Sequence, residues 1–119
     1  MTGPDPASML PLTHLTYHVL LALADSDRHG YGIIKEVLER TGGKMELETG
    51  TLYTALKRLR DDELIEPVPG DERPDGEVGR RRTYRLTLFG RKVLEAESRR
   101  LADLVTVAAE KRVLPATSG

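Results

Sequence analysis

The stretch from residue 48 to residue 60 constrains the fold of this chain more than any other. Its apolar residues recur at the i, i+3, i+4 and i+7 spacing of an amphipathic helix: Leu52, Ala55, Leu56 and Leu59. The opposite face carries hydroxyl groups, an aromatic ring and cations, and no acidic residue lies between Thr51 and Arg60. Such groups suit the phosphate oxygens and base edges of a DNA groove. An ordinary core helix with a basic face fits the segment alone equally well, so its neighbours must decide.

Bulk composition excludes several classes of protein. With 119 residues the chain has the size of one domain, and its 18 Lys and Arg against 19 Asp and Glu leave a formal charge of −1. Any binding to nucleic acid must therefore depend on where the cations cluster. The absence of cysteine rules out disulfides and thiolate metal sites. Because the chain shows neither a bilayer-spanning apolar run nor a signal-peptide pattern, we expect a soluble, cytoplasmic protein without membrane contact or cofactor.

The segments before the basic helix predict a helix-turn-helix. Residues 1–11 hold three prolines and indicate a flexible leader. Residues 12–24 are strongly apolar and predict a first helix, and residues 29–40 predict a second, ended by Gly42 and Gly43. We expect Tyr31 to pack in the core between the helices. Residues 44–48 fit a short strand or an extended link, and Thr49 is placed to cap the basic helix.

The residues after the basic helix predict a wing. Residues 64–68 form a short strand, and residues 69–79 form a loop rich in Pro and Gly. The returning strand, residues 80–86, opens with Arg80, Arg81 and Arg82 and then alternates polar with apolar side chains. Two short strands joined by a polar loop, directly after a basic helix, make the wing of a winged helix-turn-helix domain over residues 12–87.

A long helix closes the chain. It runs from Leu88 to about Val113, is capped by Thr87, and leaves residues 114–119 as a frayed tail. A helix of this length exceeds what the core of a small domain can cover, which favours contact with a second subunit. The fold class is thus mainly α with a small β wing and a C-terminal dimerisation helix over residues 88–113. The predicted dimer contacts are Leu15, Val19, Leu94, Leu101, Leu104, Val105 and Ala108.

With these elements in order, the sequence resembles the PadR-like family of winged-helix transcriptional regulators. The resemblance covers roughly residues 12–95, and the chain looks like the compact branch with a single C-terminal helix. It is carried by five blocks: His29-Gly30-Tyr31-Gly32, residues 50–59, Leu64-Ile65, residues 79–87 and Gly90-Arg91. Two positions depart from the family pattern. Thr54 stands where proline is frequent, and Glu63 stands where glycine commonly precedes the Leu-Ile pair, which leaves the end of the third helix open.

The resemblance implies a homodimer that binds a two-fold symmetric DNA operator and represses transcription until a small molecule releases it. We assign contacts with base edges and nearby phosphates to one set of side chains: Thr49, Thr51, Tyr53, Thr54, Lys57 and Arg58. The wing residues Arg80, Arg81 and Arg82 are expected to reach phosphate or the minor groove. A small apolar or aromatic effector would occupy a chamber between subunits lined by Leu15, Val19, Leu101 and Val105.

Other functions find less support in the residues. None of the four serines lies in a nucleophile elbow, so we do not expect an enzyme. His14 and His18 are four residues apart, as two metal ligands on one helix would be, but no third ligand is near them and we expect no metal site. The remaining alternative is a winged-helix adaptor that binds proteins and does not recognise an operator. The acid-free face of the third helix and the cluster Arg80–Arg82 argue against it.

Overall fold

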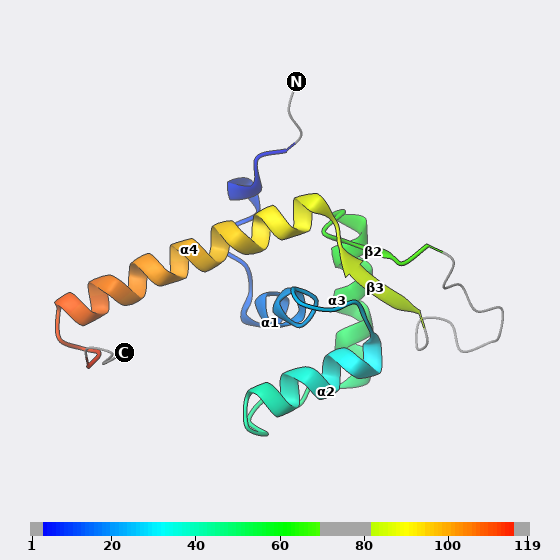
Figure 1. The fold of residues 1–119 in the computed structure, drawn as a ribbon, viewed down its shortest axis with the longest axis horizontal. Coiled ribbons are helices and arrows are strands. Elements are labelled where there is room, and N and C mark those ends of the chain that lie inside the picture. The colour runs from blue at the N-terminus through cyan, green and yellow to red at the C-terminus, as the bar shows by residue number, and fades with distance from the viewer. Residues whose placement is uncertain (1–3, 70–81, 116–119) are drawn as a thin grey trace.

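The computed structural model describes residues 4–69 and 82–115. Its mainly helical fold with a small antiparallel sheet confirms the predicted class. Figure 1 shows α4 leading away from the cluster of α1, α2 and α3, with strands β2 and β3 beside α3. In chain order the elements are η1 (Pro6–Met9), α1 (His14–Ala22), β1 (Arg28–His29), α2 (Gly30–Arg40), α3 (Thr49–Asp61), β2 (Ile65–Pro67), β3 (Thr83–Leu86) and α4 (Leu88–Glu110).

Helices α1, α2 and α3 enclose the core of the domain. The apolar stripe of α3 points inward as its spacing predicts, since Leu52, Leu56 and Leu59 are buried. On α2 the buried apolar side chains are Ile33 and Val37, and Gly30 is buried as well. The prediction for Tyr31 was wrong, because this side chain is 68% exposed. It belongs to a different stripe of α2 from Ile33 and Val37, at a helix end with little covering structure.

The sheet has three strands in the order β1-β3-β2, one more than the sequence predicts. Strand β1 includes His29, where the second helix was predicted to begin, and it pairs Arg28 with Tyr84 and His29 with Thr83. Two residues are too few to show the alternation that identifies a strand in sequence. Strand β2 pairs with the other edge of β3, where Glu66 lies opposite Arg85.

The junction between α3 and α4 is held by close backbone contacts. Glu63 adopts the left-handed conformation with φ of 63°, which places this acidic residue where glycine is more readily accommodated. Thr87 caps α4 as predicted, accepting a hydrogen bond from the Gly90 N–H at 2.8 Å, and its hydroxyl donates to the Glu63 carbonyl at 2.7 Å. A Cβ atom at Gly90 would lie 1.9 Å from the Leu64 carbonyl oxygen. The start of α4 is therefore fixed to the end of α3.

The first half of α4 belongs to the domain core, and its second half projects from it (Figure 1). Part of the segment predicted as a flexible leader lies against α4. This segment contains the 3-10 helix η1, and Met9, Leu10 and Leu12 pack against the core. The carboxylate of Glu97, 1% exposed, accepts the Leu12 N–H at 2.9 Å. The prolines of this segment are visible in the sequence, whereas its hydrogen bond to the buried carboxylate of Glu97 is not.

Candidate nucleic-acid interface

The exposed face of α3 carries most of the predicted DNA-contacting side chains. Thr51, Thr54, Lys57 and Arg58 are all exposed on this helix. Thr49 is exposed as well, but it is not the cap: α3 begins at Thr49, and the N-cap residue is Glu48, which makes no side-chain capping bond. Without an acceptor side chain over them, the first-turn N–H groups of α3 are suited to an anion such as phosphate.

Lys57 is paired on the same helix. Its Nζ lies 3.1 Å from Oδ2 of Asp61, one turn further along, and both side chains are largely exposed. The face of α3 is therefore less positive at its C-terminal end than the acid-free run from Thr51 to Arg60 suggests. An exposed ion pair of this kind contributes little to stability, but it reduces the charge that Lys57 presents to a polyanion.

Tyr53 has a structural role in addition to the predicted one. It is half-buried, and its ring lies across the start of α2, where a Cβ atom at Gly30 would be 2.5 Å from the Tyr53 hydroxyl oxygen. Any larger residue at this position would require the ring to move, so the glycine of the His29-Gly30-Tyr31-Gly32 block allows this contact between α2 and α3. Tyr53 also lines a hollow of about 200 Å³ together with Tyr31, Ile34 and Thr49.

A wider groove runs along the other side of α3, between this helix and the start of α1. It has a volume of about 700 Å³. Threonine hydroxyls and one guanidinium line it together with a larger share of apolar surface: Thr13, Leu15, Thr16, Gly50, Thr51, Thr54, Ala55 and Arg58. The face of α3 thus stands between two hollows, one shared with α1 and one shared with α2. Neither hollow could be read from the spacing of apolar residues, because both are made by elements apart in sequence.

The wing is described only in part. Arg82 directly precedes β3 and is partly exposed, whereas Arg80 and Arg81 lie outside the described residues. Arg85, the fourth arginine of this run, faces Glu66 across the strands with Nε 2.8 Å from Oε2. Arg85 therefore belongs to the cross-strand structure of the wing, and Arg82 is the described arginine of the predicted DNA-contacting cluster.

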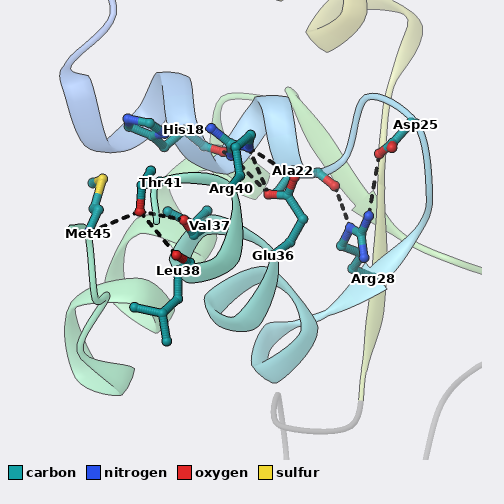
Figure 2. Close-up of polar contacts among 10 residues, drawn as sticks. All are labelled: His18, Ala22, Asp25, Arg28, Glu36, Val37, Leu38, Arg40, Thr41 and Met45. Atoms are coloured by element: carbon teal, nitrogen blue, oxygen red, sulfur yellow. Dashed lines mark hydrogen bonds and ion pairs between the residues drawn. The ribbon is translucent and has the colours of Figure 1, made fainter. Parts of the chain in front are cut away.

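A network of polar contacts links helices α1 and α2 (Figure 2). Arg40 donates to Nδ1 of His18 at 2.9 Å and to the carboxylate of Glu36 at 2.9 Å. The pKa of His18 is lowered mainly by burial and further by the nearby His14 and Arg40, while Glu36 opposes the shift. His18 is therefore neutral at pH 7 and accepts through Nδ1.

The two histidines of α1 contact each other. Their rings lie edge to face with a distance of 4.5 Å between the ring centroids. The described residues contain no group of three His, Cys, Asp or Glu that could hold a metal ion. A separate contact on α2 supports the link to α3, because the Thr41 hydroxyl donates to the Val37 carbonyl and accepts the Met45 N–H (Figure 2).

The predicted dimer residues divide into two groups. Val19 is fully buried and Leu94 is 5% exposed within the protomer, so neither presents a surface to a partner. They belong to the domain core because their helices pack there. The other five are at least partly exposed and remain candidates for a subunit contact: Leu15, Leu101, Leu104, Val105 and Ala108.

Three packed helices, a three-stranded sheet beside the exposed third helix and a projecting C-terminal helix define a winged helix-turn-helix protein. A sequence profile described as the transcriptional regulator PadR-like family matches residues 19–96, more than half of the chain. The chain therefore belongs to the PadR-like family, which is a non-enzymatic family of transcriptional regulators. None of the helices within the described residues is long and apolar enough to cross a membrane.

Individual relatives agree with this placement. A PadR family transcription regulator from Clostridium difficile is 30% identical, with a TM-score of 0.67 over 82% of this chain and 97% of that chain. Bacillus subtilis PadR in complex with operator DNA is 25% identical, with a TM-score of 0.58 over 71% of this chain and 46% of that one. Uncharacterized protein X of Lysinibacillus sphaericus is 35% identical over 97 residues, which span 76% of this chain and 86% of the relative.

Proposed function

We propose that this protein is a sequence-specific DNA-binding repressor that acts in the cytoplasm as a homodimer on a palindromic operator. The observation that carries the proposal is the exposed face of α3, where threonine hydroxyls, Lys57 and Arg58 stand out from a buried apolar stripe. This is the arrangement of a recognition helix in a helix-turn-helix protein. The structure of Bacillus subtilis PadR with operator DNA supports the same use of the fold here.

In this proposal the contacts have distinct tasks. The hydroxyls of Thr49, Thr51 and Thr54 and the cations of α3 meet base edges and nearby phosphates in the major groove. Tyr53 contributes the outer edge of a ring whose inner edge is packed on Gly30. The wing arginines Arg80, Arg81 and Arg82 bind phosphate or the minor groove, where attraction is strong and sequence information is poor.

The second half of α4 is the proposed dimer contact. Leu104 and Val105 are 53% and 51% exposed, although both are large apolar side chains on an otherwise well-formed helix. Together with Leu101 and Ala108 they form a stripe at helical spacing. A two-fold contact through this stripe would pair two copies of α3 and so double the footprint on a palindrome.

We further propose that a small apolar or aromatic effector binds between the subunits and releases the DNA. In the protomer, Leu15, Leu101 and Val105 are all at least partly exposed and can line such a chamber. Val19, also expected there, is buried in the core and is no longer part of the proposed lining. Equilibrium dialysis of small aromatic compounds against the protein, with and without DNA, would detect this ligand. The effector should bind more weakly when DNA is present, because each ligand opposes the other.

The test is a titration of the purified protein with a fluorescent duplex from the region upstream of its own gene, repeated across salt concentrations. The proposal expects binding that exceeds that of a scrambled duplex and a log affinity that falls steeply against log salt. Replacing Lys57, Arg58 and Arg81 together by alanine should abolish binding while light scattering still reports a dimer. Equal, weak binding to the upstream and scrambled duplexes, together with no preference for any duplex selected from a random pool, would favour the protein-binding adaptor.

A further inference from the structure

The hollow between α2 and α3 differs in chemistry from the rest of the α3 surface. Its four lining residues are Tyr31, Ile34, Thr49 and Tyr53, and they enclose about 200 Å³. None of the four carries a charge, although Lys57 and Arg58 lie on the same helix. Apart from the N–H groups at the start of α3, these residues offer nothing that holds a phosphate, whereas two aromatic rings and an isoleucine favour a small apolar group.

Tyr31 is the conspicuous member of this set. It is 68% exposed on α2, beside the start of the helix that reads DNA in the proposed function. An aromatic ring that exposed neither packs the core nor stabilises α2. Its position makes it a wall of the hollow, continuous with the exposed face of α3.

The hollow is formed before any ligand arrives. The ring of Tyr53 is held across Gly30 so closely that a Cβ atom there would lie 2.5 Å from the hydroxyl oxygen. Ile34 is half-buried on α2, one turn after Tyr31. Because Tyr53 and Ile34 are already packed, binding on their side of the hollow costs little conformational entropy, so even one small group can be recognised.

The major groove of DNA presents one apolar group, the C5 methyl of thymine, and next to it the O4 acceptor. We propose that this hollow binds the methyl group of one operator thymine per half-site, with the Thr49 hydroxyl donating to O4. This inference rests on the proposed function and deepens it, because it makes Tyr31 and Ile34 of α2 determinants of sequence specificity. Direct readout would then come from two helices.

The experiment begins with a duplex selected from a random pool by the wild-type protein. Each thymine is replaced in turn by deoxyuridine, which removes the methyl group and nothing else. One position in each half-site should weaken binding about fourfold, the effect of exposing one methyl group. At that position 5-bromodeoxyuridine, whose bromine has the size of a methyl group, should restore the affinity.

The same scan on variants locates the contact. Tyr31→Ala should bind the thymine and deoxyuridine duplexes equally, whereas Tyr31→Phe should keep the difference because it keeps the ring. Leu88→Ala is the matched control, since Leu88 is 72% exposed on α4 and does not line the hollow. It should discriminate as the wild type does.

Three results would overturn the inference, and they differ from one another. A wild-type protein that binds selected and scrambled duplexes alike would remove the proposed function and this inference with it. Specific binding with no sensitive thymine would remove only the methyl contact. A deoxyuridine penalty that persists unchanged in Tyr31→Ala would assign the methyl group to another part of the surface.

Discussion

At the scale of single residues, the helical glycines Gly90 and Gly50 differ in how much space surrounds them. A Cβ atom at Gly90 would lie 1.9 Å from the Leu64 carbonyl oxygen, and backbone cannot move aside as a flexible side chain can. Nothing lies within 4 Å of the corresponding atom at Gly50. The two positions therefore separate the effect of crowding from the helix propensity that both substitutions share.

We expect Gly90→Ala to destabilise the protein by about 3 kcal/mol, since the start of α4 must move away from the backbone of Leu64. Gly50→Ala should stabilise it by up to about 1 kcal/mol, because alanine is the better helix former. Urea unfolding followed by circular dichroism measures both. If Gly90→Ala were as stable as the wild type, the close approach of α4 to Leu64 would be incorrect.

Asp61 is a residue whose loss should improve DNA binding. Its carboxylate lies 3.1 Å from the Lys57 amine on the exposed face of α3. Asp61→Asn frees Lys57 for phosphate, so we expect affinity for an operator duplex to rise several-fold at low salt and the salt slope to steepen by about 1 per half-site, that is by about 2 for the proposed dimer. Stability should change little, because an exposed pair contributes at most about 1 kcal/mol.

The matched control for this prediction is Asp62→Asn, which makes the same change in net charge one residue later. No ion pair of Asp62 occurs among the described residues. Fluorescence anisotropy across salt concentrations compares the two variants. An equal gain in both would mean that general repulsion, and not the pairing of Lys57, limits the affinity.

At the scale of elements, regular patterns were predictable and contacts between distant segments were not. The α3 stripe, the Thr87 cap and the start of α4 follow from apolar spacing and capping chemistry in continuous sequence. Strand β1 was not predicted because it is two residues long and is defined by its pairing with β3. Tyr31 was misplaced because an apolar stripe does not show which of two neighbouring faces the other helices cover.

The candidate site shows the same division. Five of the six predicted α3 contacts are exposed, and Tyr53 is half-buried against Gly30. The hollow that includes Tyr31 and Ile34 could not be predicted, since it needs the relative position of α2 and α3. One signal did exist: the close Gly30 and Gly32 flank an aromatic residue, and glycines of that kind mark a close approach.

The docking of residues 4–12 on α4 should depend on pH. The pKa of Glu97 is lowered chiefly by the hydrogen bond from Arg100 and also by the Leu12 N–H, against the opposing effect of burial. Because the folded pKa lies below the ordinary value of 4.5, the stabilisation is complete above that pH and is lost as the pH falls through the folded pKa. The cause is protonation of the acceptor of both bonds.

Glu97→Gln tests this contribution. The variant should be less stable than the wild type at pH 7, since a neutral amide replaces a charge-assisted acceptor. The difference should shrink below pH 4.5 as the wild-type carboxylate is protonated. Urea midpoints measured from pH 7 to pH 3 give the comparison. A difference that stays constant over this range would show that Glu97 acts through packing alone.

At the scale of the whole molecule, the exposed half of α4 bears on whether the protein is a monomer or a dimer. Leu101, Leu104, Val105 and Ala108 lie on one side of the helix, and none of them is buried by the described part of the protomer. A charge placed within a buried apolar contact is strongly unfavourable, whereas on a free surface it is nearly neutral. Substitution on and off the stripe therefore separates a dimer contact from a solvated helix.

We expect Leu104→Glu to convert the proposed dimer to a monomer in multi-angle light scattering at micromolar concentration. Its circular dichroism should stay close to wild type, because the core contains neither Leu104 nor its neighbours. Thr106→Glu, on the opposite side of α4, adds the same charge and should remain a dimer. The monomeric variant should also lose most of its affinity for a palindromic duplex, since a single α3 reads one half-site. If both variants stayed dimeric, the subunits would have to meet through a surface other than this stripe.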